Sequence, residues 1–468
     1  MFLLKNAKVK IVVTPHSCTI NSGLARTWLR NVTKYVIDNL GDVQHYAGTK
    51  WDGTIYRVNT DGSFKTGYLQ EFISKLKEVG CIVEVVTEEK PSQFKEVWGN
   101  TYGTYTLFPH QKQALDSILS NKVEGIPFVR GIVNAATNAG KSLIIGAILC
   151  NFEGYALVLI HNQLVFKQLV QLCKDLGLNT GEIRADKLQF GKVTVAMERT
   201  FFKRYITDTA VQQYVSRVGL VITDEVHRAS GSNYQSLLLE CPAFSRIGFS
   251  GTSLEGTQAQ QEAIKSSFGA VLVDITNDEM IDAGVSSEVT VEIFKIFYNK
   301  WAKFDDYATR IRSMYKNNQR LEIIKKVVKE YSRGILIVVD KVEHGKELQY
   351  WLNDSYSVDF IHGELDAATR ELMLRRFEEN EIDALITTSV LQEGVNIKGI
   401  RTIVYAAGGK SSIKVKQFIG RGLRKKEEDN RLRVVDFFDD TTNLDEHSKA
   451  RIEIYKKEKF KVNEICNF

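Results

Sequence analysis

Short apolar segments alternate with longer stretches of helical apolar spacing through most of the chain. This alternation is typical of parallel sheets whose strands are joined by helices. Two series of strands are predicted, separated by the least regular stretch, residues 277–316. The first series is Ile132–Asn134, Tyr155–Ile160, Val193–Ala196, Leu220–Thr223 and Ser245–Phe249, and the second is Gly334–Val339, Ser357–Ile361, Ala384–Thr388, Thr402–Tyr405 and Val434–Phe437. The pattern therefore predicts two α/β lobes of similar size.

Residues 1–95 follow a different pattern, which predicts a small α+β domain. One helical stripe runs from Leu24 to Val36 and a second from Leu69 to Val79. Strands are expected at Ala7–Val13, Ile55–Val58 and Cys81–Val86. The polar and aromatic segment 88–103 is expected to link this domain to the first lobe.

The composition excludes several classes of protein. Of the 468 residues, 43% are hydrophobic, 25% are charged and only 5 are Pro, which is a globular rather than a disordered composition. The longest apolar run, Leu143–Cys150, is far shorter than the ~20 residues of a membrane span, so no membrane association is expected. The 6 Cys form no CxxC pair, which indicates neither a disulfide framework nor a zinc site.

Residues 135–142 predict a phosphate-binding loop. Their sequence is Ala-Ala-Thr-Asn-Ala-Gly-Lys-Ser, and they lie between a predicted strand and a predicted helix. In such a loop the backbone N–H groups and the helix N-terminus meet the phosphates, Lys141 reaches the terminal phosphates, and Ser142 can bind Mg²⁺. An ordinary strand–turn–helix connection is the alternative interpretation.

An acidic pair follows the predicted strand Leu220–Thr223. Asp224 and Glu225, in the sequence Asp-Glu-Val-His, are placed at the carboxyl edge of a parallel sheet, where ligands bind in open α/β folds. Asp224 would hold Mg²⁺ and Glu225 would orient and deprotonate an attacking water. A solvated loop is the alternative, but the phosphate loop about eighty residues upstream favours the catalytic interpretation.

A basic helix is predicted over residues 417–424. Gln417, Arg421 and Arg424 share one face, and Val415, Phe418 and Ile419 form the buried side. Two arginines that project together suit the charge that develops on a transferring phosphate. A basic surface helix is the alternative.

These motifs, in this order, resemble those of superfamily 2 helicases and translocases over about residues 105–440. Gln111 is similar to the adenine-reading glutamine, Ser250-Gly251-Thr252 to motif III, residues 361–364 with Arg370 to the first block of the second lobe, and residues 387–397 to motif V. The resemblance implies two tandem RecA-like parallel-sheet lobes plus the small N-terminal α+β domain. It also implies ATP and Mg²⁺ as cofactors, with ATP between lobes that close to complete the site.

The resemblance assigns roles to individual residues. The catalytic residues would be Lys141, Asp224, Glu225, Arg421 and Arg424. The ATP contacts would be Gln111, Ala136, Thr137, Asn138, Ala139, Gly140, Lys141, Ser142, Glu393, Gly394 and Asn396. Mg²⁺ would be held by Ser142 and Asp224, and DNA by Asn162, Thr252 and Thr388. Three positions depart from the family: Asn138 replaces a usual Gly, Asn396 replaces a usual Asp, and residues 160–164 match motif Ia only loosely.

The N-terminal module resembles the accessory domain of phage UvsW-type branch-migration helicases. The residues that carry this resemblance are Lys50–Gly53, Gly67–Leu69 and Gly80–Val83. It implies a DNA-binding role for the module and for Trp51, whose alternative is a packed core position. The expected domains are 1–95 (accessory domain), 96–288 (first lobe), 289–445 (second lobe) and 446–468 (basic C-terminal helix).

The expected function is an ATP-dependent DNA helicase that remodels branched DNA, such as forks and four-way junctions, in phage-type recombination, repair and replication. We expect a monomer in the bacterial or host-cell cytoplasm, acting alongside recombination proteins. Between residues 410 and 433 there are nine Lys or Arg and three Asp or Glu, which supports a nucleic-acid partner. An RNA helicase or remodeller, and the motor subunit of a restriction-nuclease assembly, are the alternatives.

Overall fold

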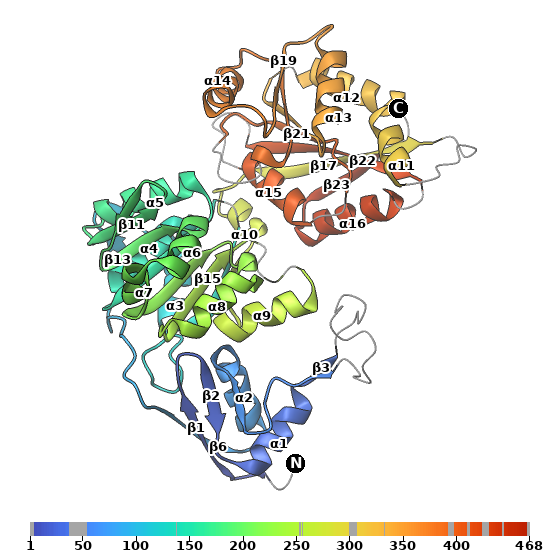
Figure 1. Ribbon diagram of the computed structural model, residues 1–468. Helices are drawn as coiled ribbons and strands as arrows, with labels where there is room; N and C mark the ends of the chain where they lie inside the picture. Colours follow the sequence, from blue (N-terminus) through green and yellow to red (C-terminus); the bar gives the residue numbers. More distant parts are fainter. Residues whose placement is uncertain are drawn as a thin grey trace. The chain divides into compact units, whose positions relative to one another are not determined.

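The computed structural model divides the chain into two compact units (Figure 1). The first contains residues 1–135 and 140–275, and the second contains residues 276–468 with residues 136–139. The structure describes residues 4–36, 54–136, 138–251, 254, 256–298, 307–331, 333–391, 397–409, 412–423, 430–441 and 444–465. Among these residues, no helix is both long and apolar enough to cross a membrane.

The N-terminal part of the first unit is a four-stranded sheet with two helices. The sheet order is β5-β2-β1-β6, in which β6 is parallel to β1 and the other pairs are antiparallel. The elements are β1 (Lys8–Val13), β2 (Ser17–Ile20), α1 (Gly23–Val32), β5 (Ser63–Lys65), α2 (Leu69–Glu78) and β6 (Ile82–Thr87). Between α1 and β5 in sequence, β3 (Tyr35–Val36) and β4 (Thr54–Ile55) form a short antiparallel pair of their own.

This N-terminal sheet shares its hydrophobic core with the lobe that follows. Phe128 and Phe244, which flank strands of the first lobe, belong to the same buried cluster as Phe64 and Phe72. The fully buried Arg130 connects the same two parts, because its guanidinium donates to the carbonyl oxygens of Phe244 (2.8 Å), Ser267 (2.9 Å) and Pro15. The N-terminal sheet is therefore packed on the first lobe as part of one unit.

The first lobe is built on an eight-stranded sheet in the order β12-β11-β13-β10-β14-β15-β9-β16. All neighbours are parallel except β12, which pairs antiparallel with β11. The strands are β9 (Arg130–Ala135), β10 (Tyr155–Ile160), β11 (Thr180–Arg184), β12 (Lys187–Gln189), β13 (Val193–Met197), β14 (Val218–Asp224), β15 (Ser245–Ser250) and β16 (Val271–Ile275). Every strand predicted for the first series is thus present.

Helices of this lobe connect the strands, as a parallel sheet requires. They are α3 (Pro109–Leu119), α4 (Lys141–Asn151), α5 (Gln163–Asp175), α6 (Glu198–Thr207), α7 (Thr209–Val215), α8 (Ser232–Glu240) and α9 (Gln258–Phe268), and the short hairpin of β7 (Thr101–Tyr102) and β8 (Tyr105–Thr106) precedes them.

The second unit is built on a seven-stranded sheet in which all neighbours are parallel, in the order β19-β20-β18-β21-β22-β17-β23. Its strands are β17 (Glu288–Phe297), β18 (Ile335–Val338), β19 (Val358–Ile361), β20 (Ala384–Thr387), β21 (Thr402–Tyr405), β22 (Arg431–Asp440) and β23 (Lys461–Ile465). Its helices are α10 (Asn277–Asp282), α11 (Tyr307–Tyr315), α12 (Asn318–Tyr331), α13 (Val342–Leu352), α14 (Ala367–Glu378), α15 (Ser412–Gly422) and α16 (Leu444–Lys457).

Alternate residues of β18 face two separate cores. Ile335 and Ile337 pack in a cluster with residues of α12 and α13, whereas Leu336 packs in a cluster with residues of α15 and α16. Successive side chains of a strand point to opposite faces of its sheet, so helices cover both faces here. The predicted fold class, two RecA-like parallel-sheet lobes with a small N-terminal α+β part, is confirmed.

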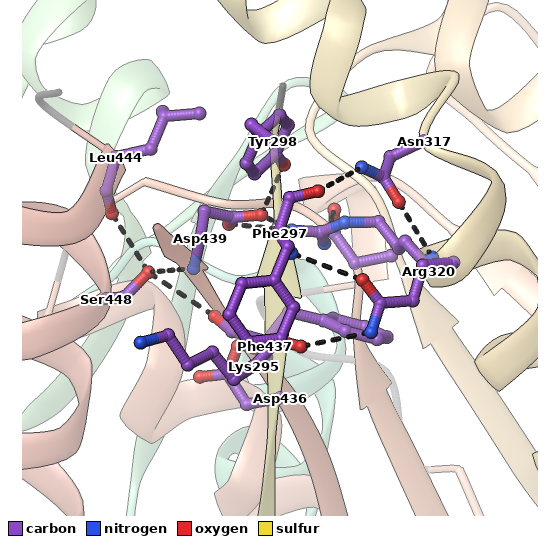
Figure 2. A network of polar contacts seen from close by, with 12 residues as sticks. Lys295, Phe297, Tyr298, Asn317, Arg320, Asp436, Phe437, Asp439, Leu444 and Ser448 are labelled. Atoms are coloured by element: carbon purple, nitrogen blue, oxygen red, sulfur yellow. Dashed lines mark hydrogen bonds and ion pairs between the residues drawn. The ribbon is translucent and has the colours of Figure 1, made fainter. Parts of the chain in front are cut away.

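Two buried ion pairs join β22 to helices of the second unit. Nη2 of Arg320 donates to both carboxylate oxygens of Asp439 at 2.5 and 2.6 Å, and Tyr298 donates to the same carboxylate (Figure 2). Arg451 donates to Asp436 at 2.8 and 3.0 Å. All four charged side chains are 1% exposed, so each ion depends on its partner for the interactions that water would otherwise supply.

Several local predictions are wrong. Tyr35 and Val36 form β3 instead of continuing α1, because the helix ends at Val32 and is capped by Thr33. The described part of residues 277–316 is not irregular: it contains α10, α11 and the ten-residue β17, which pairs on both sides within the sheet. The tail predicted as a basic helix also contains the edge strand β23. The domain boundaries stay predictions.

The docking of the N-terminal part can be tested at Glu262 of α9. Its carboxylate accepts from Arg57 at 2.6 and 2.8 Å and from the Tyr68 hydroxyl at 2.8 Å. We expect Glu262→Gln to lower the free energy of unfolding of the first unit by ~1.5–3 kcal/mol, the usual worth of hydrogen bonds to a charged group. Glu71→Gln is the matched control, because Glu71 is more exposed and makes a single 3.2 Å contact with Arg57. Equal effects of the two variants in urea unfolding would contradict this docking.

Acid sensitivity of the second unit is expected from His344. Burial lowers the pKa of this histidine from 6.5 to about 3, with a further contribution from Arg320, and the ring stacks on Tyr315 at 4.0 Å. The unfolded chain therefore binds the proton first. The neutral, buried ring of His344 contributes fully to the free energy of unfolding above pH 6.5. This contribution is lost as the pH falls from 6.5 to 3, at ~1.4 kcal/mol per pH unit.

The variant His344→Phe keeps an aromatic ring but cannot titrate. We expect it to lose ~2 kcal/mol less stability than the wild type between pH 7 and 5. Hydrogen-exchange protection of β18, measured in both proteins at both pH values, reports this unit separately. Identical pH dependence in the two proteins would show that His344 is not the titrating group.

Candidate functional site

The predicted phosphate-binding loop connects the carboxyl end of β9 to α4. Two of its residues, Asn138 and Gly140, have a left-handed backbone, with φ of 73° and 75°. Glycine adopts this conformation without strain, and asparagine tolerates it better than most other residues. Asn138, which stands where a Gly was expected, is therefore a residue that tolerates the left-handed backbone of this loop.

Gly140 is also fixed by the side chain of Gln111. A Cβ atom at position 140 would lie 2.1 Å from Nε2 of Gln111, so no larger residue fits without rearrangement. Gln111 is buried, and its Oε1 accepts a hydrogen bond at 3.0 Å from the backbone N–H of Phe108 at the start of α3. The glutamine thus joins α3 to the loop, and its contact with adenine stays a prediction.

The loop presents hydrogen-bond donors where a helix begins. Among the residues that the structure describes, no side chain caps the N-terminus of α4, where Gly140 is the N-cap. Nδ2 of Asn138 is buried and has no hydrogen-bond partner in the described part of the chain. A helix N-terminus that is rich in unused donors attracts anions, and Lys141 and Ser142 form the first turn of this helix. The residues present therefore fit the phosphates of a nucleotide.

The acidic pair lies at the end of β14. Asp224 is the last residue of the strand and is 8% exposed, and Glu225 has a left-handed backbone with φ of 55°. Val226 packs against β15 where Gly248 leaves room, since a Cβ there would lie 2.3 Å from Cγ2 of Val226. This packing fixes the sharp turn after the strand. A non-glycine residue in this conformation costs ~1–3 kcal/mol, and such residues cluster at functional sites.

Glu225 is held by a serine from the neighbouring strand. Oγ of Ser250, the last residue of β15, donates to Oε2 of Glu225 at 3.0 Å. Nδ1 of His227 lies 3.2 Å from the same Oγ and 3.4 Å from Oε2 of Glu225. The Glu225 side chain is 24% exposed, so it is oriented by the protein and still open to a water molecule. This arrangement suits a general base.

The register of the sheet brings these groups to one edge. β15 lies between β14 and β9, with Asp224 opposite Phe249 and Ser250 opposite Asn134. The phosphate loop, the acidic pair and Ser250 therefore all lie at the carboxyl ends of adjacent parallel strands. The sequence prediction that Asp224 and Glu225 lie at this edge is confirmed.

A second carboxylate connects the acidic turn to the end of β13. Glu198, the first residue of α6, accepts from Nε of Arg228 at 3.1 Å, and His161 lies 3.3 Å away. Burial alone would raise the pKa of Glu198, but the hydrogen bonds from His161 and Arg228 lower it overall. His161 immediately precedes Asn162, so this carboxylate joins the acidic turn to the segment predicted to contact DNA.

The predicted DNA contacts that are described have structural roles of their own. Oδ1 of Asn162 caps α5 by accepting from the N–H groups of Leu164 (2.8 Å) and Val165 (3.2 Å). Thr388 follows β20, is 7% exposed, and donates its N–H to the carbonyl of Ile361 at 3.2 Å. DNA binding by either residue stays a prediction.

Arg421 lies on α15 of the second unit and is partly buried. Val415, Phe418 and Ile419 are buried, as the helical pattern predicted. Buried arginines support the segment that leads into this helix: Arg451 donates to the carbonyl of Gly409 at 2.8 Å, and Arg320 donates to that of Ala406 at 3.4 Å. Two deeply buried arginines thus hold residues 406 and 409, which precede this helix in sequence.

Several predicted site residues lie outside the described residues. They are Trp51, Thr137, Thr252, Glu393, Gly394, Asn396 and Arg424. Within the described ranges, no group of three or more His, Cys, Asp or Glu side chains is arranged to hold a metal ion. Mg²⁺ is usually bound by one or two protein groups with phosphates and water, so Ser142 and Asp224 fit this mode.

Sequence reasoning missed the roles of Ser250 and His227. Both lie within recognised motifs, but their contact with Glu225 depends on the order of β14 and β15 in the sheet. A serine at the end of one strand and a glutamate just after another were the available signals. Only the strand order shows that they meet.

Two family models match the chain. The model described as "Type III restriction enzyme, res subunit" matches residues 104–255, and that described as "Helicase conserved C-terminal domain" matches residues 287–426. The first match contains the phosphate loop and the acidic turn, and the second contains α15 with Arg421.

The chain is also similar to proteins that carry DNA helicase names. It is 25% identical to the ATP-dependent DNA helicase UvsW of Enterobacteria phage T4 over 411 residues, which cover 80% of this chain and 79% of the relative. It is 25% identical to the ATP-dependent DNA helicase RecG of Staphylococcus aureus over 310 residues, which cover 63% of this chain and 42% of the relative.

The fold has a counterpart among solved structures. A fragment of a putative HsdR subunit of a type I restriction enzyme from Vibrio vulnificus superposes with a TM-score of 0.58 at 17% identity, covering 78% of this chain and 70% of that one. The chain thus has two helicase-type lobes in sequence, a phosphate loop and an acidic turn at one sheet edge, and matches to both family models. Together these findings show that the chain resembles the superfamily 2 helicases, UvsW among them.

Proposed function

We propose that this chain is an ATP-dependent DNA helicase or translocase that remodels branched DNA by branch migration, fork regression or D-loop unwinding. The observation that carries the ATPase part is the meeting of the phosphate loop, Asp224 and the Ser250-held Glu225 at one edge of the first sheet. A protein that only binds a nucleotide has no need for a carboxylate such as Glu225, which Ser250 orients and which stays open to water.

Each residue of this edge has a proposed part in hydrolysis. Lys141 and the N-terminus of α4 bind the β- and γ-phosphates of ATP. Ser142 and Asp224 would hold Mg²⁺, which when bound neutralises phosphate charge. Glu225 accepts a proton from the attacking water, and Ser250 keeps the carboxylate in position for it.

Arg421 and Arg424 are proposed to stabilise the charge that develops on the transferring phosphate. A guanidinium is always protonated and suits a planar, highly charged group. The hydrogen bonds from the buried Arg451 and Arg320 to Gly409 and Ala406, which precede α15 in sequence, support this role, because an arginine acts on a transition state only if its own position is well defined.

The proposal of DNA as the substrate is supported by the likeness to two proteins named DNA helicases. The basic tail, residues 446–468, offers fewer unpaired cations for DNA phosphates than its composition suggests. Arg451 is buried against Asp436, Lys449 pairs with Asp445 at 2.9 Å, and Lys459 pairs with Asp278 at 2.5 Å. Lys457 and Lys461 have no ion pair among the described residues and could contact phosphates.

The substrate class can be tested with a panel of nucleic acids. ATP hydrolysis by the full chain would be measured with four-way junctions, forks, linear duplex DNA, single strands and RNA duplexes at equal nucleotide concentration. We expect junctions and forks to give the greatest stimulation and to be converted to products only when ATP is present. Stronger stimulation by RNA duplexes would assign the motor to RNA remodelling and contradict the DNA proposal.

A further inference from the structure

A hollow of about 600 Å³ lies at the edge of the first sheet opposite the phosphate loop. It is lined by residues that immediately precede or begin four neighbouring strands, β11, β13, β10 and β14, together with residues of α7. The phosphate loop instead follows a carboxyl strand end. This hollow, which we call the amino-edge pocket, is lined by Tyr155, Asn179, Phe190, Gly191, Lys192, Ala210, Gln213, Tyr214 and Arg217.

Three aromatic rings form one wall of the amino-edge pocket. The rings of Phe190 and Tyr214 stack with centroids 5.1 Å apart and an angle of 17°, and Tyr155 meets Tyr214 edge-on at 6.1 Å. Tyr214 is buried and its hydroxyl donates to the carbonyl of Ala156 at 2.9 Å, so this ring is held in place and supports the other two rings. Phe190 and Tyr155 are 36% and 38% exposed and leave apolar ring surface open to a ligand.

Two cations lie beside these rings. Lys192 and Arg217 are exposed, and neither has an ion-pair partner among the residues that the structure describes. The described residues that line the pocket include no Asp or Glu. Hydrogen bonds fix the backbone of both cationic residues. The N–H of Lys192 donates to Oδ1 of Asn179 at 2.9 Å, and the N–H of Arg217 donates to the carbonyl of Tyr214 at 3.0 Å. The pocket therefore combines exposed ring faces with uncompensated positive charge.

This combination matches the chemistry of a single nucleic-acid strand. Proteins bind such strands by stacking bases on aromatic side chains while lysine and arginine contact the phosphates. A purely apolar ligand would not need two cations, and a free anion would not need two exposed rings. ATP is not the expected occupant, because its proposed site is at the other edge of the sheet.

We propose that the amino-edge pocket binds a nucleotide unit of single-stranded nucleic acid, with a base on Phe190 or Tyr155 and adjacent phosphates on Lys192 and Arg217. The proposal rests on the proposed function, in which strands are separated or exchanged. It adds a contact on the first lobe that is distinct from the nucleotide-hydrolysing edge. Such a contact would retain one released strand while the motor moves.

The test uses the full chain without ATP and a fluorescein-labelled twelve-residue oligo(dT), followed by anisotropy from low to moderate salt. The double variant Lys192→Ala/Arg217→Ala removes both cations without breaking any ion pair among the described residues. We expect weaker binding and a salt dependence reduced by about 1.4 in slope, because each phosphate contact on a single strand contributes ~0.7. Lys203→Ala, which removes an exposed lysine of α6 outside the pocket, is the matched control and should bind like the wild type.

A stacking variant gives an independent readout. Phe190→Ala removes one exposed ring and keeps both cations, so we expect roughly tenfold weaker binding with an unchanged salt slope. Unchanged affinity and slope in the double variant, with a wild type that binds the oligonucleotide, would overturn the pocket assignment and leave the proposed function standing. A wild type that binds no nucleic acid would overturn both.

Discussion

The parallel register of β9, β15 and β14 is the constraint on which the proposed chemistry of this chain depends. Neighbouring strands of a parallel sheet are joined by crossover connections of about a dozen residues or more, so the strand ends that meet at one edge come from separate segments of the chain. Here they place Ala135, Ser250 and Asp224 at a single edge. That register alone brings together the loop backbone, the acidic turn and the serine that orients Glu225, so that they can form one site.

In the second unit, buried ion pairs support the segment that leads into α15. Arg320 with Asp439 and Arg451 with Asp436 have almost no exposed surface, and such pairs often contribute little net stability. Both arginines also donate to carbonyls of the segment between β21 and α15. We interpret these pairs as fixing the approach to α15, where Arg421 lies, rather than as a source of stability alone.

Much of this organisation could be predicted from the sequence because its signals are local. Apolar runs located the central strands of both sheets, and the spacing of Val415, Phe418 and Ile419 identified the buried face of α15. Strand β17 was not identified from the sequence, although the alternation of apolar and polar residues along it is typical of a strand. The sequence could not show that Ser250 meets Glu225, that Gln111 packs on Gly140, or that the N-terminal sheet shares a core with Phe128 and Phe244, since each depends on tertiary contacts.

The central claim is that Glu225 activates water at this edge, and Glu225→Gln tests it most directly. The variant keeps the shape of the side chain and an oxygen that can accept from Ser250, but it loses the basic carboxylate. The account predicts that ATP binding is retained while turnover at saturating ATP and DNA falls by ~10²–10⁴-fold. Wild-type turnover in this variant, with ATP binding intact, would contradict the account.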